Sequence, residues 1–413
     1  MADTGEWLHI IFPGRASNSS GCDFTDAVFG INGNIVSGDV EVHVRSSQWQ
    51  AHGHHQDPKY NNIALHVVWQ TDSSAVTRRQ NGKVIPTICL SPFVSASIDE
   101  LLNEPANKQS FCPAPGSRLD TGSLSTLLIA AGVKRFKAKA TAFRKALKNQ
   151  DADQLLYGGV ARALGYTQNA EPCQELARRL PLGELTGSGS VISMQALLLG
   201  QAGLLPCQRQ GKAIDRQAHR LEKIWRSVGT VEHMKETDWC FFRVRPHNFP
   251  TRRLIALSYL LHRYQRSRLF PGILELVRTA PEHQGHCHLE SGLAVESHGY
   301  WQHHFDFGVS AGRTSVLIGC ERASAIALNT VLPFTAAIAD LDYDSKLKKR
   351  ALEIYRGYPA RTDNELTRYM RQQLRIGTGV RLSACQQQGL IHIFQACCRH
   401  RDCLSCPVYA SPG

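Results

Sequence analysis

Residues that could bind a metal ion alternate with valines between positions 39 and 45. A period of two is typical of a β-strand, in which successive side chains point to opposite faces. One face would then hold two carboxylates, an imidazole and a guanidinium. Carboxylates bind Mg²⁺, the ion neutralises charge on a scissile phosphate, and a neighbouring base activates water. The candidate catalytic residues are therefore Asp23, Asp39, Glu41 and His43.

A β-hairpin would bring the first of these acids to the strand. The dipeptide Asn-Gly at 32–33 is typical of the two-residue turn that joins antiparallel strands. With a plain turn, Asp26 would lie opposite the first acid of the strand. With a one-residue bulge at Gly38, Asp23 would lie opposite His43 instead, and bulges often redirect side chains at active sites. We favour the second arrangement and keep Asp26 as the alternative.

Each candidate has a role in this arrangement. Asp23 and Glu41 would bind Mg²⁺ or Mn²⁺, and Asp39 would either join them or orient them. His43 would act as general base, metal ligand or transition-state stabiliser, roles that a sequence does not separate. A solvated polar sheet face is the alternative explanation of the whole row. Against it stands the nearly continuous apolar segment 63–69, which is typical of a strand covered on both faces in a parallel sheet.

A histidine-rich loop follows the polar strand. A transition-metal site with imidazole ligands is one interpretation of His52, His54, His55 and His66. The other is a loop that contacts a phosphate group, with His66 as a hydrogen-bonded core residue. On the second interpretation, the residues around the site that would bind nucleic acid are Arg45, His52, His54 and Lys59.

Several segments resemble the signature of a bacterial family known mainly as a domain of unknown function. They are Gly-Asp-Val-Glu-Val-His-Val-Arg-Ser-Ser-x-Trp at 38–49, His-x-His-x-x-Asp-Pro-x-Tyr-Asn-Asn at 52–62 and Leu-His-Val-Val at 65–68. The similarity continues through Leu-Gly-Tyr at 164–166, Gly-Gln-Ala-Gly-Leu-Leu at 200–205, Arg-Pro-His-Asn-Phe-Pro at 245–250 and the terminal cysteines. The resemblance therefore covers nearly the whole chain, but it implies no particular activity.

A more distant resemblance does imply one. The order of an acid, a hairpin and then an acid-x-basic triplet, followed by a helix and a buried strand, is similar to the PD-(D/E)xK core of restriction-endonuclease-like nucleases. In that superfamily the acids bind the metal ion and a lysine supports the attacking water. The resemblance implies that Asp23 is the first acid and Glu41 the second, with His43 in place of the lysine. The cation would then be protonated His43, Arg45 or Lys59, or it would be absent.

Four arginines lie before or at the start of a helix expected in the second half of the chain. Thr251 can cap this helix, and the main-chain N–H groups of a helix start bind phosphate well. We therefore predict that these arginines contact nucleic-acid phosphates. The alternative is that they pair with acids of the other domain and fix its position. The four are Arg243, Arg245, Arg252 and Arg253.

The C-terminal cysteines have the spacing of metal ligands. Thiolates at such spacing bind one Zn²⁺ ion or one [4Fe–4S] cluster, and such clusters occur in some nucleases of the superfamily that the chain resembles. A closed thiolate site would have a structural role, and buried free thiols are the alternative. The predicted ligands are Cys398, Cys403, Cys406 and a fourth residue that is Cys385, Cys397 or His400.

Length and composition set the frame for these sites. A chain of 413 residues is too long for one ordinary core. β-rich patterns run to about residue 95, a segment rich in Pro, Gly and Ser follows, and helical periodicity begins near residue 131. We therefore predict an α+β protein, with a restriction-endonuclease-like α/β domain at 1–115 and a larger, mostly α-helical domain at 116–413.

Charge and targeting signals bear on partners and location. A net charge of +12 and a pI near 9.2 favour attraction to a polyanion, nucleic acid first. Singly scattered cysteines favour a reducing compartment, and the sequence begins with no export signal and contains no long uninterrupted apolar run. We expect a cytoplasmic protein without a membrane partner.

Three functions remain open at this point. The leading one is a metal-dependent nuclease that hydrolyses phosphodiester bonds in DNA or RNA. The second is a non-catalytic nucleic-acid-binding protein that keeps the nuclease fold. The third is a histidine-rich metalloenzyme that acts on a small molecule.

Overall fold

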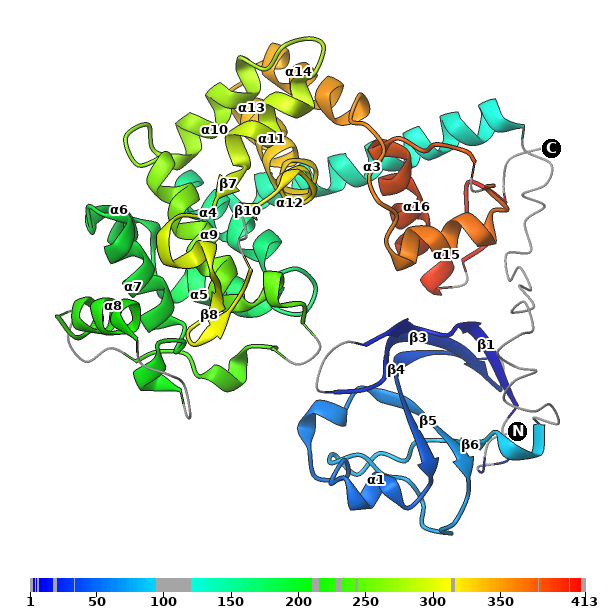
Figure 1. Ribbon diagram of the computed structural model, residues 1–413. Coiled ribbons are helices and arrows are strands. Elements are labelled where there is room, and N and C mark those ends of the chain that lie inside the picture. Colours follow the sequence, from blue (N-terminus) through cyan, green and yellow to red (C-terminus); the bar gives the residue numbers. More distant parts are fainter. Residues whose placement is uncertain are drawn as a thin grey trace. The chain divides into compact units, whose positions relative to one another are not determined.

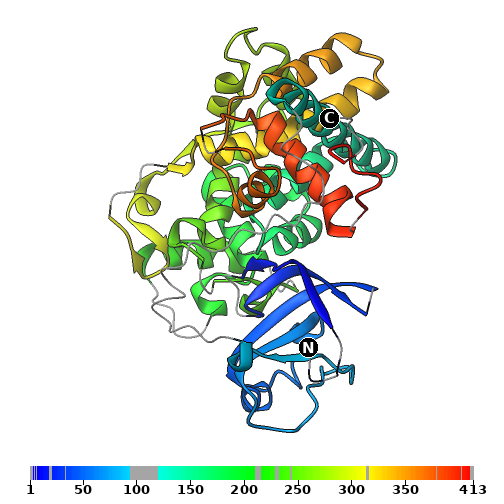
Figure 2. The same cartoon turned by 90° about the vertical axis from the view of Figure 1, so that its right-hand side faces the viewer.

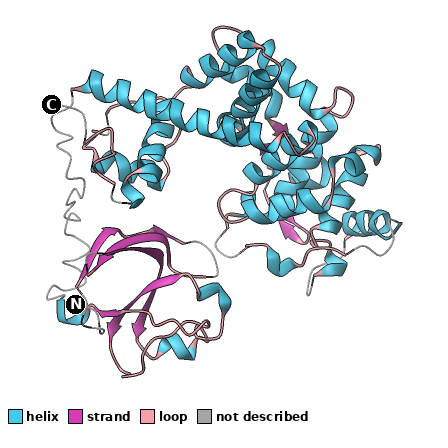
Figure 3. Ribbon diagram, turned by 180° about the vertical axis from the view of Figure 1, so that it is seen from behind, coloured by secondary structure: helices cyan, strands magenta, loops and turns pink. Residues whose placement is uncertain are grey.

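The chain folds into a curled N-terminal sheet and a largely helical remainder, as the α+β expectation required (Figures 1 and 3). The computed structural model describes residues 3, 5, 7–17, 21–32, 34–93, 120–209, 215–227, 232–241, 244–312, 316–377, 379–400 and 402–409. Two compact units divide the chain. The first comprises Met1–Gly132, Thr362–Leu382 and Gln386–Gly413, and the second Val133–Arg361 and Ser383–Cys385. The boundary predicted near residue 115 lies outside the described residues.

One mixed sheet forms the N-terminal part of the first unit, and its curl is visible in Figure 2. The strand order is β1-β3-β4-β5-β6, with β2 paired to β3. Strands β1, β3 and β4 are antiparallel, whereas β4, β5 and β6 are parallel. The bounds are β1 Leu8–Phe12, β2 Arg15–Ala16, β3 Phe24–Ile31, β4 Asn34–Arg45, β5 Ile63–Gln70 and β6 Thr87–Cys89.

The predicted hairpin is present, but its bulge lies in the other strand. Ile31 pairs with Asn34 across the turn, and Asn32 has a φ of 48°, as a turn of this type requires. The pairing shifts between Phe24 and Ala27, so the extra residue belongs to β3. The prediction of a bulge at Gly38 was therefore wrong. Gly38 instead allows close packing, since a Cβ there would lie 2.5 Å from the Cβ of Ala64.

The face of β4 that carries Glu41 and His43 is buried. Glu41 and His43 are 6% and 8% exposed, whereas Val42 and Val44 on the opposite face are 39% and 61% exposed. The hypothesis of a solvated polar face is therefore wrong for these two residues. Trp49 contacts the rings of His54 and His66 and packs in a small apolar cluster with Cys22, Tyr60, Ile63 and Ile85.

The crossover from β4 to the parallel strand β5 carries the histidine loop. Helix α1 (Gln48–Ala51) follows β4, and the 3₁₀ turn η1 (Pro58–Tyr60) precedes β5. Ser47 does not cap α1 with its side chain, because its hydroxyl donates to Asp72 at 2.7 Å. A further 3₁₀ turn, η2 (Ser91–Phe93), follows β6.

Helices from the end of the chain complete the first unit. Helices α15 (Glu365–Gln373) and α16 (Ala384–Ala396) share an apolar cluster with the start of α3 (Thr121–Ala146) and with residues of β1 and β3. Phe12 lies edge-on to Tyr369 and Phe394, with ring centroids 4.7 and 5.0 Å apart. The 3₁₀ turn η8 (Cys398–His400) follows α16.

The described residues of the second unit are mainly helical, with four short strands and several 3₁₀ turns, and the helices dominate the ribbon (Figure 1). Its α-helices are α4 (Ala152–Leu164), α5 (Ala170–Arg179), α6 (Leu182–Gly187), α7 (Val191–Gln201), α8 (Arg216–Ser227), α9 (Pro250–Arg263), α10 (Leu269–Arg278), α11 (Gly285–Leu293), α12 (Cys320–Ile326), α13 (Leu332–Leu341) and α14 (Ser345–Arg356). A π-helical segment, η7 (Ala327–Val331), joins α12 to α13. The short elements are η3 (Pro206–Gln208), η4 (Glu236–Asp238), η5 (Pro246–Asn248), η6 (Gly299–Gln302), β7 (Val295–Glu296), β8 (His304–Asp306), β9 (Val309–Ser310) and β10 (Val316–Ile318).

Two helical stretches of the second unit are long and apolar enough to cross a membrane. Found among the described residues, they are Val191–Gln208 and Cys320–Leu341, and 67% and 78% of the most apolar 18 residues of each are buried within the protein. Burial of this extent is what the core helices of a globular unit show, so these stretches are weak evidence for a membrane span.

Candidate metal centre

Three imidazoles converge on the buried face of the sheet. Potential ligand atoms of His43, His52 and His54 all lie within 4.8 Å of one another. Strand β4 supplies His43, and the loop after α1 supplies the other two. Among the described residues this is the single group of three or more His, Cys, Asp or Glu side chains with such spacing. The transition-metal interpretation of the histidine loop therefore has a geometric basis.

The Glu41 carboxylate lies against this group. Its Oε1 is 3.3 Å from Nε2 of His54 and 3.7 Å from Nε2 of His43. Its Oε2 accepts a hydrogen bond from the main-chain N–H of Asp23 at 3.2 Å. Two imidazole nitrogens thus face the same carboxylate oxygen, which is the arrangement expected of ligands that share an ion.

His54 is buried with no hydrogen-bond partner for either ring nitrogen. The ring stacks on Tyr60, with centroids 3.8 Å apart, and it is 7% exposed. Buried imidazoles normally make hydrogen bonds, because an unsatisfied polar group costs free energy. A metal ion bound at Nε2 would give that nitrogen a partner, so this side chain fits a ligand better than a core residue.

The two remaining acids of the predicted site lie nearby, but they have different surroundings. Continuing the register Phe24–Val40 places Asp23 opposite Glu41, not opposite His43 as predicted. The Asp23 carboxylate accepts from the N–H of Val42 at 2.9 Å, which holds it beside Glu41.

Asp39 uses both of its carboxylate oxygens within the fold. Its Oδ1 accepts from the N–H of Asp26, which lies in the bulge, and its Oδ2 accepts from the side-chain amide of Asn62. Of the two roles predicted for Asp39, this geometry favours the orienting one. Asp26 has a φ of 57°, so its place in the bulge is a left-handed conformation that Asp tolerates better than most residues.

Burial dominates the electrostatics of the site. Burial and then the charge of Asp23 raise the pKa of Glu41 to about 8. Burial and the neighbouring imidazoles lower the pKa of His43 to about 4 and also lower that of His54. Without a bound cation, the contacts of Glu41 with these histidines are therefore not ion pairs at neutral pH. A metal ion would supply the missing positive charge and stabilise the carboxylate.

Arg45 and Lys59, two of the residues predicted to contact nucleic acid, are exposed close in sequence to the site. In the second unit, Arg245 is exposed and Arg243 lies outside the described residues.

Arg252 and Arg253 are 1% and 6% exposed. Their guanidinium groups donate to main-chain carbonyls, among them those of Trp301 and Leu317. Helix α9 begins at Pro250, so Thr251 is not its cap. These two arginines have the surroundings of structural residues, not of a phosphate-binding surface.

The C-terminal cysteines are brought together only in part. Cys385 lies in the first turn of α16, and Cys397 lies just beyond its end. At 1.5 Å per residue the two are about 18 Å apart, so Cys385 cannot share an ion with the others. Burial and the thiol of Cys406 raise the pKa of Cys397 to about 11, with Cys403 nearby. Of the two cysteines considered as fourth ligand, Cys397 is therefore the one that lies near Cys403 and Cys406.

The comparisons with known proteins place the chain in a family. Residues 1–364 match the model of the family described as "Protein of unknown function (DUF2851)". The chain belongs to this family. No curated protein and no solved structure matches it significantly. Because residues 1–364 include β4 and the histidine loop, the candidate metal centre lies within the part of the chain that defines family membership.

Proposed function

We propose that this member of the DUF2851 family is a metal-dependent phosphodiesterase of the nuclease type, and that its ion is a transition metal. The observation that carries the proposal is the convergence of three imidazoles and one carboxylate oxygen in a buried site. Imidazole ligands favour Zn²⁺, Mn²⁺, Co²⁺ or Fe²⁺ over Mg²⁺, which prefers oxygen ligands. The sequence predicted Mg²⁺ or Mn²⁺ at this site. The imidazoles favour Mn²⁺ and other ions that accept nitrogen ligands over Mg²⁺.

The strand arrangement supports phosphodiester chemistry. The antiparallel strands β1, β3 and β4, followed by a helix and the parallel strand β5, have the order that the resemblance to PD-(D/E)xK nucleases implies. Asp23 and Glu41, the two acids that this resemblance implies, lie next to each other across the hairpin. A net charge of +12 favours a polyanionic substrate.

Residue roles follow from burial and contacts. Glu41, His43, His52 and His54 would hold the ion, and His52 is the exposed member of this set. A bound ion of this kind acts as a Lewis acid and lowers the pKa of coordinated water. Asp23, oriented by the N–H of Val42, would accept the proton of the attacking water.

Outside the ligand group, the exposed Arg45 and Lys59 would contact the phosphate backbone. Fewer observations support the two alternative functions. A non-catalytic nucleic-acid-binding protein was expected to use Arg243, Arg245, Arg252 and Arg253, and the last two are buried. A metalloenzyme acting on a small molecule is compatible with the same ligands. Cleavage of a small phosphodiester but of no polynucleotide would favour that alternative.

The experiment compares metal-stripped full-length chain reloaded with Zn²⁺, Mn²⁺, Co²⁺ or Mg²⁺. Substrates are single- and double-stranded DNA and RNA, with bis(p-nitrophenyl) phosphate as the small phosphodiester. Glu41→Gln should lower metal-dependent cleavage by at least about 100-fold, because it removes a charged ligand. His55→Gln is the matched control, since His55 neighbours the ligand group without joining it.

Circular dichroism and urea unfolding check that the variants are folded. Absence of cleavage by a metal-loaded wild-type chain would overturn the proposal. Undiminished cleavage by a folded Glu41→Gln variant would overturn it equally.

A further inference from the structure

A further buried imidazole lies behind the metal centre. His66, on β5, is fully buried and pairs across the sheet with Glu41. Its Nε2 is 2.9 Å from Nδ1 of His43. Neither the family match nor the proposed catalytic step gives this residue a role.

His66 belongs to a continuous chain of hydrogen bonds. Its Nδ1 lies 3.4 Å from the hydroxyl of Thr77 and 3.5 Å from that of Thr87, and these hydroxyls are 2.9 Å apart. At the other end, Nε2 of His43 is 3.2 Å from Nδ1 of His52. Both threonines are buried. These hydrogen bonds therefore connect the two threonine hydroxyls, through the imidazoles of His66 and His43, to the predicted ion.

A neutral imidazole has one donor and one acceptor nitrogen. Only two arrangements of the protons therefore allow all hydrogen bonds between the threonines, His66 and His43. In one, His66 donates to His43, and Nε2 of His43 carries a proton that excludes a metal ion. In the other, Nδ1–H of His43 donates to His66, and Nδ1–H of His66 donates to a threonine hydroxyl. Only the second arrangement leaves the lone pair of His43 Nε2 facing Glu41.

We infer that His66 is a positioning residue, which accepts the Nδ1–H of His43 and so holds the His43 tautomer that binds metal through Nε2. The inference rests on the proposed metal site. Metal-binding histidines commonly have such a partner on the second nitrogen, and it is usually a carboxylate or a carbonyl. Here a second imidazole takes that place, oriented in turn by Thr77 and Thr87.

The test titrates Zn²⁺ alone into metal-free full-length chain and two variants. His66→Leu removes the acceptor at similar volume, and we expect about 10- to 100-fold weaker Zn²⁺ binding. His66→Gln retains an acceptor oxygen, and we expect affinity within about threefold of the wild type, since the hydrogen bond from His43 is kept. Equal affinity of wild type and a folded His66→Leu variant would overturn the inference.

A second measurement does not depend on the variants. Long-range ¹H–¹⁵N NMR of the zinc-loaded wild type should show His43 protonated at Nδ1, and protonation at Nε2 would overturn the inference. Zinc binding that follows this pattern without phosphodiester cleavage would leave the inference standing and remove the proposed function. A wild-type chain that binds no zinc would remove both.

Discussion

The buried polar groups of the two units are satisfied in different ways. In the second unit, Arg209 donates to Asp306 at 2.8 and 3.0 Å and to Glu236 at 2.8 Å, and it lies over the ring of Phe241. In the first unit, His54 is equally buried, yet neither ring nitrogen has a hydrogen-bond partner. The first pattern stabilises a fold, whereas the second leaves binding capacity for a ligand.

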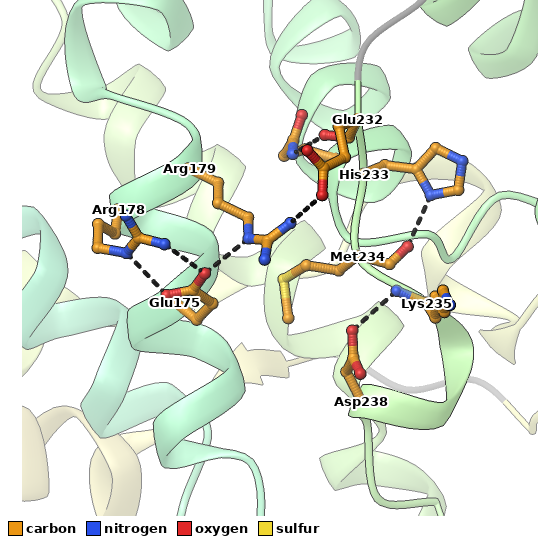
Figure 4. A network of polar contacts seen from close by, with 9 residues as sticks. Glu175, Arg178, Arg179, Glu232, His233, Met234, Lys235 and Asp238 are labelled. Carbon is orange, nitrogen blue, oxygen red and sulfur yellow. Dashed lines mark hydrogen bonds and ion pairs between the residues drawn. The ribbon is translucent and has the colours of Figure 1, made fainter.

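The largest expected change in stability comes from removing one partner of the buried Arg209–Asp306 ion pair. Asp306→Ala leaves the Arg209 guanidinium buried without its main partner, and we expect the free energy of unfolding to fall by about 3–5 kcal/mol. Urea unfolding measures it. The control is Arg178→Ala, which removes an exposed ion pair with Glu175 (Figure 4) and should leave stability nearly unchanged. Similar losses for both variants would contradict the assignment of Arg209 and Asp306 as a structural pair.

A partly buried lysine of the second unit offers a pH-dependent test. Burial and then the charge of Arg135 lower the pKa of Lys139 to about 7, and its amine donates to Asn329. Between pH 7 and 10.5 the unfolded chain therefore binds one more proton than the folded chain, so stability rises with pH across this window.

Lys139→Met should abolish this slope. Its advantage over wild type should be largest near pH 7 and should shrink by at most about 3 kcal/mol by pH 9.5, at about 1.4 kcal/mol per unit. Urea unfolding of both chains at the two pH values measures the difference. A constant difference between the chains would mean that Lys139 does not titrate in this range.

The smallest expected effect has the opposite sign and lies in the candidate site. His54→Phe keeps the stacking on Tyr60 and removes two unsatisfied nitrogens, so the metal-free chain should gain about 1 kcal/mol of stability. Unfolding in the presence of a chelator measures it. Zn²⁺ should stabilise the wild type and not the variant. A clear loss of stability in the metal-free variant would show that His54 is a satisfied core residue.

Local rules predicted the strand that carries the site. The Asn-Gly turn and the period-two alternation predicted the hairpin and the shared face of Glu41 and His43. They did not predict which face is buried, because that depends on Trp49 and the loop after it, which lie beyond the strand.

Other features depended on contacts that are distant in sequence. Gly38 suggested a bulge, but its reason is the close approach of Ala64 on the neighbouring strand. The sequence around Arg252 and Arg253 would be the same whether their side chains faced solvent or main-chain carbonyls. Only the packing around α9 shows that they donate to carbonyls. His66 gave a weak signal, a single histidine within an apolar strand, and its contact with His43 depends on the parallel register.

Strand β4 buries Glu41 and His43 and exposes Val42 and Val44, and this arrangement limits the register that the hairpin can adopt. A shift of the hairpin by one residue would bury Val42 and Val44 and would bring Glu41 and His43 to the surface. Such a slip would separate the ligands, and it would also displace Val40, which is buried in the observed register. Asp39 opposes the shift, because it ties the bulge in β3 to Asn62 beside β5. Engineering of this domain for stability should therefore leave the exposed valines alone and preserve Asp39, since the register that this carboxylate maintains is the one that assembles the ligands.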